Sequence, residues 1–206
     1  GGMLITDDEN IARIAQMVRN HGEMIVPTLK DRSYKSEFLG WGYRMTELEA
    51  ALGIAQLAKL DYLNNERNKL GTYLHNEVNK IEGLTHVQHD YVKHVYWVFG
   101  MSYDEDKIGI PRNLFCDALK AEGIPCAAGY VQPLYLSPLY LEKRAFAFKH
   151  YQGNVKYEKG ICPVAELLYE KELVNTMICR PPATIEDMQD VVSAIHKIIE
   201  NKNELS

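Results

Sequence analysis

The chain has 206 residues, of which 46% are hydrophobic and 25% are charged, and its formal net charge is −5. These proportions are typical of a globular protein with one large domain or two small ones. They argue against nucleic acid and anionic membranes as partners, which are bound through basic patches, and the apolar runs are far shorter than the ~20 residues of a membrane-spanning helix.

The first part of the chain predicts a strand, a helix and a long loop. Residues 3–6 are an apolar run that fits a buried strand. Residues 7–8 offer an N-cap to a helix whose apolar positions recur at helical spacing, and Gly22 follows as its C′ residue. Residues 23–39 then predict an irregular loop.

A second helix is expected at residues 46–60. Thr46 and Glu49 have the spacing of a capping box. The helix is apolar on nearly every side, so we expect it to be buried or wedged between subunits. Its small residues would let another backbone come close. Such a helix fixes the loop in front of it, which contains Tyr43 and Arg44.

The rest of the chain alternates between helix and strand. A long helix carries an apolar stripe from Leu63 to Ile81 and ends before Gly83. We expect the later elements to form a compact α/β layer with a small sheet covered on one face. In chain order they are a strand at 91–103, a helix from Pro111 to Gly123, a strand at 124–130, a loop-rich segment at 131–162, a helix at 163–173, a strand at 176–179 and a helix from Thr184.

Residues 3–6 have no clear strand partner within the next ~80 residues, and an unpaired buried strand is costly. The simplest explanation is that the sheet to which they belong is missing. We therefore expect the chain to be the back half of a larger protein.

The cysteines and histidines predict no metal site. Cys116, Cys126, Cys162 and Cys179 lie far apart without a CxxC pair, and the histidines show no ligand spacing. Reduced, partly buried thiols are typical of a cytoplasmic protein. The start of the sequence also lacks a basic flank followed by an apolar core, so no secretory signal is expected.

Several short motifs follow one another along the chain. They are GGMLITDD at residues 1–8, RNHG at 19–22, GYRM at 42–45 followed by Glu47, Ala50-Ala51 and Gln56-Leu57, Gly123-Ile124 followed by Tyr130, Pro133 and Pro138, and CPVAE at 162–166. In this order and spacing they resemble the DegT/DnrJ/StrS sugar aminotransferase family, which uses pyridoxal 5′-phosphate (PLP) on the fold-type-I scaffold.

The resemblance implies an α/β fold in two parts. Residues 1–60 would be the C-terminal remnant of the PLP-binding large domain. Residues 61–206 would be the complete small C-terminal domain, which begins with a long linking helix and contains a small sheet. The lysine that holds PLP would precede residue 1, so no catalytic residue is expected in this chain.

The resemblance also assigns the loop at residues 42–44 to the dimer interface of a homodimer. Arg44 and Gly42 would lie at the neighbour's cofactor phosphate, and Tyr43 at the substrate. The guanidinium of Arg44 suits bidentate phosphate contacts, although an interface or helix-end salt bridge is an equal alternative. Gly42 replaces a common family Asn, which puts its direct cofactor contact in doubt.

Four more residues are predicted to bind substrate. Tyr130 matches the tyrosine of the family's sugar pocket, with Gly129 where many members have His, which favours a different sugar or a cyclitol. His94 and Trp97 match a family strand. Arg180 is a candidate for the carboxylate of the amino donor. Ordinary packing is the competing interpretation for each of these residues.

The predicted function is amino transfer from glutamate or glutamine to a keto-sugar, such as a nucleotide sugar of polysaccharide biosynthesis, or to a keto-cyclitol. The complete protein would use PLP, and this fragment alone would be inactive. The alternative is a non-catalytic assembly or binding module that docks through the helix at 46–60.

Overall fold

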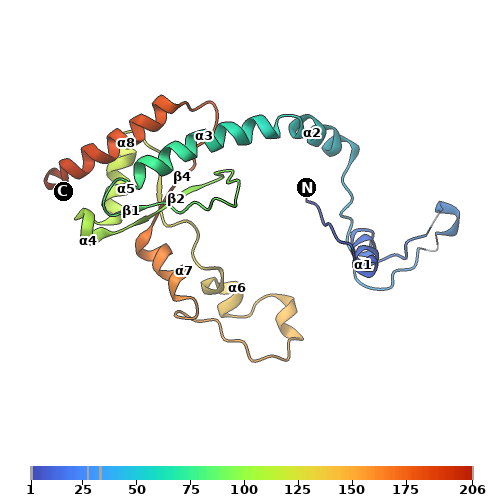
Figure 1. Ribbon diagram of the computed structural model, residues 1–206. Coiled ribbons are helices and arrows are strands. Elements are labelled where there is room, and N and C mark those ends of the chain that lie inside the picture. Colours follow the sequence, from blue (N-terminus) through green and yellow to red (C-terminus); the bar gives the residue numbers. More distant parts are fainter. Residues whose placement is uncertain (1, 27, 33, 206) are drawn as a thin grey trace. The chain divides into compact units, whose positions relative to one another are not determined.

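The computed structural model describes residues 2–26, 28–32 and 34–205 (Figure 1). Gly1, the first residue of the GGM motif, lies outside these ranges. The chain divides into two compact units, Gly1–Leu60 and Asp61–Ser206. The assignment of these units to a large-domain remnant and a small domain stays a prediction.

The first unit contains α1 (Glu9–Arg19), a 3-10 turn (Leu29–Asp31) and α2 (Glu47–Leu57). Asp8 caps α1, since its Oδ1 accepts hydrogen bonds from the backbone N–H groups of Asn10 and Ile11 at 2.8 and 2.9 Å. The predicted capping box of α2 is confirmed. The Thr46 hydroxyl accepts from Glu49 N–H at 3.3 Å, and the Glu49 carboxylate accepts from Thr46 N–H at 2.8 Å.

One prediction for this unit is wrong. Residues 3–6 form no strand, and their side chains are mostly exposed, because no described segment pairs with their backbone. Of the two alternatives for the helix at 46–60, burial within its own unit is not found, and a place between subunits stays a prediction. No side chain of α2 is buried within the unit, and Leu48 and Ile54 are 85% and 73% exposed. The unit has no described element that covers the apolar surface of this helix.

The second unit contains a four-stranded antiparallel sheet in the order β1-β2-β4-β3. Its central pair joins β2 to β4, with Phe99 opposite Thr176 and Met101 opposite Val174. Phe99, Met101 and Tyr103 alternate toward the core along β2. The strands are β1 (Leu84–Thr85), β2 (Phe99–Tyr103), β3 (Ala127–Ala128) and β4 (Leu173–Thr176).

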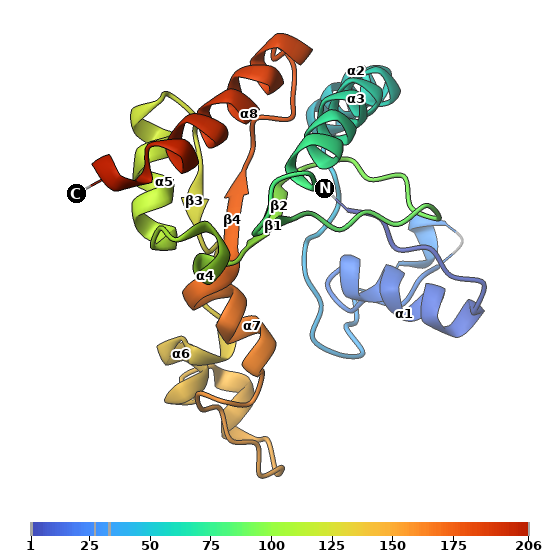
Figure 2. The same cartoon turned by 60° about the vertical axis from the view of Figure 1, so that its left-hand side comes forward.

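Three helices pack over this sheet and bury its hydrophobic core: α3 (Leu60–Val78), α5 (Arg112–Ala121) and α8 (Ile185–Glu200). Figure 2 shows all three at the same end of the unit. Thr184 caps α8 and shares a capping box with Asp187. The predicted mixed α/β fold with a small sheet is therefore confirmed.

The strands are shorter than predicted or shifted along the sequence. The strand expected at 91–103 begins only at Phe99, because Tyr96 adopts a positive φ of 44°, which a strand cannot contain. The strand expected at 124–130 is limited to β3. The strand expected at 176–179 is found earlier in the sequence, as β4. The helix expected at 163–173 is α7 (Pro163–Leu167) followed by a π turn (Leu168–Glu172), and the chain enters the sheet directly after this turn.

The loop-rich segment at 131–162 forms a lobe of short helical turns. These are Leu134–Leu136, α6 (Pro138–Leu141) and Phe146–Lys149. Tyr140, Phe148 and Tyr157 form an aromatic cluster with ring centroids 5.3–6.2 Å apart. In Figure 2 this lobe and α7 extend away from α5 and α8. The short helix α4 (Glu105–Ile108) follows β2.

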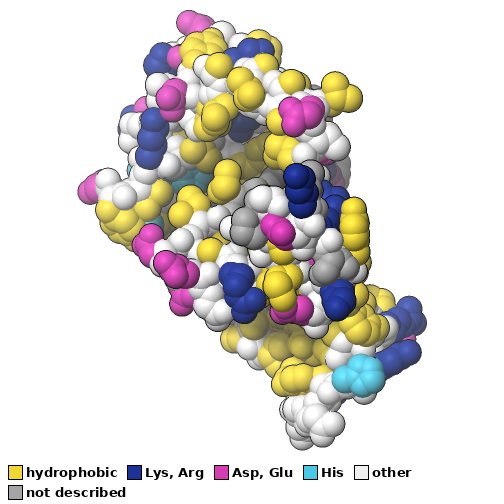
Figure 3. Space-filling model, turned by 90° about the vertical axis from the view of Figure 1, so that its right-hand side faces the viewer, with side chains coloured by type: hydrophobic (Ala, Val, Ile, Leu, Met, Phe, Trp, Pro, Cys, Tyr) yellow, Lys and Arg dark blue, Asp and Glu magenta, His cyan; other side chains and the backbone are white. Residues whose placement is uncertain are grey.

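Hydrophobic side chains reach the surface in several places, between charged ones, on the face drawn in Figure 3. In the described part of the chain, every helix is too short or too polar to cross a bilayer.

Candidate functional site

The predicted cofactor-phosphate loop is tied by backbone hydrogen bonds to the end of α1. Trp41 N–H donates to the carbonyl of Val18 at 2.7 Å, and Tyr43 N–H donates to the carbonyl of Arg19 at 3.1 Å. In return, His21 N–H donates to the carbonyl of Trp41 at 3.0 Å. The RNHG and GYRM motifs, which lie about 20 residues apart in sequence, therefore form one local structure.

The close approach of these two segments requires glycine. The predicted C′ position is off by one residue, since Asn20 is the C-cap and both His21 and Gly22 then adopt positive φ, at 62° and 75°. A Cβ on Gly22 would overlap the carbonyl of Phe38, and one on Gly40 would overlap the backbone of Gly22. These glycines let the two backbones touch.

The Arg44 side chain lies against the RNHG turn. One guanidinium nitrogen donates to the Asn20 side-chain oxygen, and the other lies 3.4 Å from His21 Nε2. Gly42 faces the same histidine, since a Cβ there would lie 3.2 Å from its Cε1. The ring of Tyr43 stacks on that of Trp41 with centroids 5.9 Å apart, and both rings are exposed. The structure thus brings Gly42, Tyr43 and Arg44 together.

In the second unit, Tyr130 and Arg180 line one cavity of about 860 Å³. Its walls come from the segment before and after β3, from the end of β4, and from the Pro181-Pro182 turn that leads to α8. Arg180 is the only basic side chain among the described residues that line it, and Asp187 is the only acidic one. The cavity therefore combines an apolar wall with a single guanidinium.

Side chains of β4 fix the backbone that leads to Tyr130. The Asn175 amide donates to the carbonyls of Gly129 and Ala127, and the Thr176 hydroxyl donates to the carbonyl of Pro125 at 2.6 Å. Gly129 has a positive φ of 68°, and a Cβ there would lie 2.7 Å from the Tyr169 carbonyl oxygen. The residue found in place of the family's histidine is therefore required by the local backbone.

His94 and Trp97 do not line this cavity, and they precede β2 rather than lying on it. His94 Nδ1 accepts a hydrogen bond from Tyr96 N–H at 2.8 Å, which stabilises the turn at Tyr96. Trp97 is exposed and lies under the guanidinium of Arg67, 5.8 Å from the ring centre. The prediction that these residues lie on a strand is therefore wrong, because the positive φ of Tyr96 interrupts the extended backbone before β2 begins.

A buried histidine that the sequence pattern did not indicate, His86, lies beside His94, with ring centroids 6.2 Å apart. His86 is 5% exposed, stacks on Phe99 at 4.2 Å, and its Nδ1 lies 3.0 Å from His75 Nδ1. Asn79 holds the His86 backbone through its N–H and its carbonyl. Burial is the main cause, and with smaller effects from the nearby His75 and His94 it lowers the pKa of His86 to about 4. His86 is therefore neutral at physiological pH.

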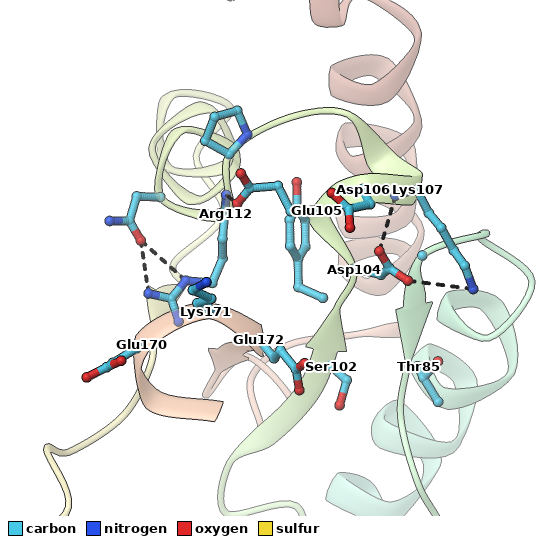
Figure 4. A pocket seen from close by; sticks show the side chains of 14 residues that line it. Thr85, Ser102, Asp104, Glu105, Asp106, Lys107, Arg112, Glu170, Lys171 and Glu172 are labelled. Carbon is cyan, nitrogen blue, oxygen red and sulfur yellow. Dashed lines mark hydrogen bonds and ion pairs between the residues drawn. The ribbon is translucent and has the colours of Figure 1, made fainter. Parts of the chain in front are cut away.

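A second cavity, of about 710 Å³, is lined mostly by charged side chains (Figure 4). It is lined by Asp104, Glu105, Asp106, Glu170 and Glu172 and by Lys107, Arg112 and Lys171. Its acidic excess disfavours an anionic ligand. No cluster of three or more metal-binding side chains occurs in residues 2–26, 28–32 and 34–205.

Glu166, the last residue of the CPVAE motif, closes the lobe at 131–162. Its buried carboxylate accepts hydrogen bonds from the Tyr135 hydroxyl and from Gly160 N–H, the latter at 2.6 Å. These two hydrogen bonds lower the pKa of Glu166, and the bond from Tyr135 has the larger effect. The carboxylate therefore joins both ends of the lobe to α7.

Replacing Glu166 by alanine is expected to open the lobe. Loss of both bonds should increase the rate of tryptic cleavage between Lys143 and Lys159 by about tenfold, because local opening exposes the backbone to protease. Limited proteolysis followed by mass spectrometry measures this rate. The matched control is Glu170→Ala, which removes only an exposed ion pair with Lys159 and should leave cleavage nearly unchanged. Equal rates for wild type and Glu166→Ala would contradict the role of Glu166.

The sequence matches the DegT/DnrJ/EryC1/StrS aminotransferase family over residues 1–196. It is 31% identical to an uncharacterized protein of Methanocaldococcus jannaschii over 97% of this chain and 50% of that protein. It is 28% identical to the spore coat polysaccharide biosynthesis protein SpsC of Bacillus subtilis over 97% of this chain and 49% of that protein. The chain thus spans about half the length of these curated relatives.

The fold is that of solved aminotransferases. The structure of S. venezuelae DesV matches with a TM-score of 0.73 and 23% identity, covering 96% of this chain and 46% of DesV. Helicobacter pylori PseC, an aminotransferase involved in the biosynthesis of pseudoaminic acid, matches with a TM-score of 0.67 and 20% identity, covering 95% of this chain and 47% of PseC. These matches likewise cover about half of each solved chain.

Proposed function

This chain belongs to the DegT/DnrJ/EryC1/StrS aminotransferase family, and from that premise we propose that it is part of a PLP-dependent aminotransferase. The enzyme would move an amino group from glutamate or glutamine to a keto-sugar, such as a nucleotide-linked one, or to a keto-cyclitol. The name of SpsC, a polysaccharide biosynthesis protein, supports a sugar substrate. Residues 1–60 would belong to the large domain and residues 61–206 would form the small domain.

The observation that supports this proposal best is the hydrogen-bonded pairing of the RNHG turn with the GYRM loop. This pairing presents Arg44, Gly42 and Tyr43 together on one exposed surface. A guanidinium offers five N–H donors in a planar fork that matches phosphate oxygens. Asn20 and His21 orient Arg44 but engage only part of this donor set.

These residues fit a supporting role at the cofactor phosphate. Arg44 would bind phosphate oxygens, and at Gly42 only the backbone N–H is available. By the likeness of this chain to the family, the lysine that holds PLP would come from outside this chain. When bound, PLP supplies an electron sink for the carbon that carries the amino group.

The second unit would bind the substrates. Arg180, the single guanidinium among the described residues that line the cavity, would pair with the donor's carboxylate. Tyr130, which lines the same cavity, would contact the keto substrate. Tyr43, Trp97 and His94 remain predicted substrate contacts from outside this cavity. His94 would act through the turn that it stabilises at Tyr96.

The test is amino transfer by the longest natural protein that contains this sequence. Purified with PLP, it should show a visible absorbance band that borohydride removes by fixing PLP to a lysine. With glutamate and a panel of nucleotide-linked keto-sugars and keto-cyclitols, it should release 2-oxoglutarate. Arg180→Gln should raise the KM for glutamate at least tenfold, because a charged hydrogen-bonded pair is lost. A folded protein without the band and without amino transfer would refute the proposal.

The 206-residue chain alone should be inactive in the same assay. When the chain is mixed with about one equivalent of PLP and reduced with borohydride, each of its lysines should stay unmodified. Mass spectrometry of tryptic peptides measures this directly. A lysine of this chain labelled in full would contradict the prediction that the PLP lysine lies outside it.

The exposed apolar surface of α2 supports assembly, either as the homodimer of an enzyme or as a non-catalytic module. Leu52 and Leu57 are 62% and 69% exposed, and large exposed apolar patches are typical of interfaces. Sizing and cross-linking of the natural protein should detect a dimer that Ile54→Asp disrupts, whereas Glu47→Gln leaves it intact. Assembly without amino transfer would favour the non-catalytic alternative, and a stable monomer would exclude both forms of assembly.

A further inference from the structure

Two cysteines from neighbouring elements lie together beside the cavity of Tyr130 and Arg180. Cys116 is on the buried face of α5 and is 1% exposed. Cys126 precedes β3, is half-buried and lines the cavity. Its thiol donates a hydrogen bond to the Cys116 carbonyl at 3.4 Å. All four cysteines of the chain are free thiols.

The local backbone explains why these residues meet. After α5 the chain reverses at Gly123, which has a positive φ of 88°. Ile124 N–H then donates to the carbonyl of Leu119 at 2.9 Å, so the returning segment runs back along the helix. The Thr176 hydroxyl holds the Pro125 carbonyl at 2.6 Å and fixes Cys126 against α5.

The surroundings of the two thiols differ. The interaction with the Cys116 side chain, supported by the charge of Lys120, lowers the pKa of the Cys126 thiol. The same interaction, together with burial, raises the pKa of the Cys116 thiol. Since the thiolate is the nucleophile, Cys126 is the more reactive and the more accessible of the pair. Cys179, by contrast, is fully buried, and burial raises its pKa to about 12.

We propose that Cys126 and Cys116 are an oxidation-sensitive pair, in which a hydroperoxide converts the two thiols into an intrachain disulfide. The Cys126 thiolate attacks one oxygen of the hydroperoxide, the O–O bond breaks, and Cys126 becomes a sulfenic acid while water or an alcohol leaves. The Cys116 sulfur then attacks the Cys126 sulfur, the S–O bond breaks and a second water leaves. In total, two thiols lose two electrons and two protons, and the hydroperoxide takes them up.

The disulfide would join α5 covalently to the segment that forms one wall of the cavity. It would remove the Cys126 thiol from that wall and limit the movement of Ala127 and Ala128. This modification site is independent of the amino-transfer proposal, because it requires only the fold of the second unit.

The test is peptide mapping after mild oxidation of the folded chain with hydrogen peroxide, followed by blocking of free thiols. Trypsin places Cys116 in the peptide 113–120 and Cys126 in the peptide 121–143. The expected product is these two peptides joined by a disulfide, with the count of free thiols falling from four to two. Dithiothreitol should restore both peptides.

Two comparisons make the test decisive. Cys162→Ser, which removes an exposed cysteine, should still give the linked peptides, whereas Cys126→Ser should abolish them. In the unoxidised wild type, iodoacetamide should label Cys126 at least tenfold faster than Cys116, a measurement that needs no variant. Peptides that stay separate, with Cys126 either unmodified or oxidised to sulfinic acid, would overturn the proposal, and so would linkage through Cys162.

Discussion

Replacing Gly71 by alanine is expected to destabilise the second unit by about 2 kcal/mol, although alanine is the better helix former. Gly71 lies in the buried face of α3, and a Cβ there would overlap the ring of Tyr96. That ring is 1% exposed and stacks near His86 and Phe99, so it has little room to move. An overlap this close should cost about 3 kcal/mol, the upper end of the usual range for overpacking, and the gain in helix propensity offsets about 1 kcal/mol, which leaves about 2 kcal/mol.

Urea unfolding followed by circular dichroism measures this change. The matched control is Gly53→Ala in α2, where a Cβ meets open space, so this substitution should be neutral or stabilise its unit by up to about 1 kcal/mol. If Gly71→Ala were as stable as the wild type, Tyr96 would not pack against α3 as described.

Acidification from pH 7.5 to 5.0 is expected to remove about 2 kcal/mol of stability through His86 alone. Its pKa is lowered to about 4 in the folded protein, chiefly by burial, against an unfolded value of 6.5. Below pH 6.5 the unfolded chain binds a proton that the folded chain does not bind. The stability is therefore complete above pH 6.5 and is lost as the pH falls from 6.5 toward 4.

His86 faces His75 from α3 and His94 and Tyr96 from the segment before β2, and it stacks on Phe99 of β2. No carboxylate among the described residues forms an ion pair with it. The His86→Gln variant should be unfolded in urea at both pH values. Its loss of stability on acidification should be smaller than that of the wild type by about 2 kcal/mol. His196→Gln, which changes an exposed residue of α8, should retain the wild-type loss. An equal loss for wild type and His86→Gln would disprove the assignment.

The starts of α2 and α8 were predictable because their determinants are local. The capping boxes at Thr46 and Thr184 join residues three positions apart, so a short window of sequence contains the whole interaction. The family motifs were equally visible as short patterns. Their spatial arrangement was not predictable, because the sequence does not show that the RNHG turn and the GYRM loop are hydrogen-bonded to each other.

The strand limits and the surroundings of the site depended on distant residues. Asn175 and Thr176 fix the segment before Tyr130 across 46 to 51 residues of sequence, and Arg112 donates to the Tyr169 carbonyl across 57. The pairing of Cys116 with Cys126 and the burial of His86 likewise depend on packing between elements. A sequence window shows none of these partners.

By itself, the sequence indicated the family through the order of its short motifs. It also predicted the N-caps of α2 and α8 and the α/β class, because these follow from local hydrogen bonds and from the spacing of apolar residues. Only the tertiary structure decided that Tyr130 and Arg180 share a cavity, that α2 keeps its apolar surface exposed within its own unit, and that His86 is neutral. The physical reason is that proximity, burial and pKa arise from atoms that packing brings together, whatever their separation along the chain.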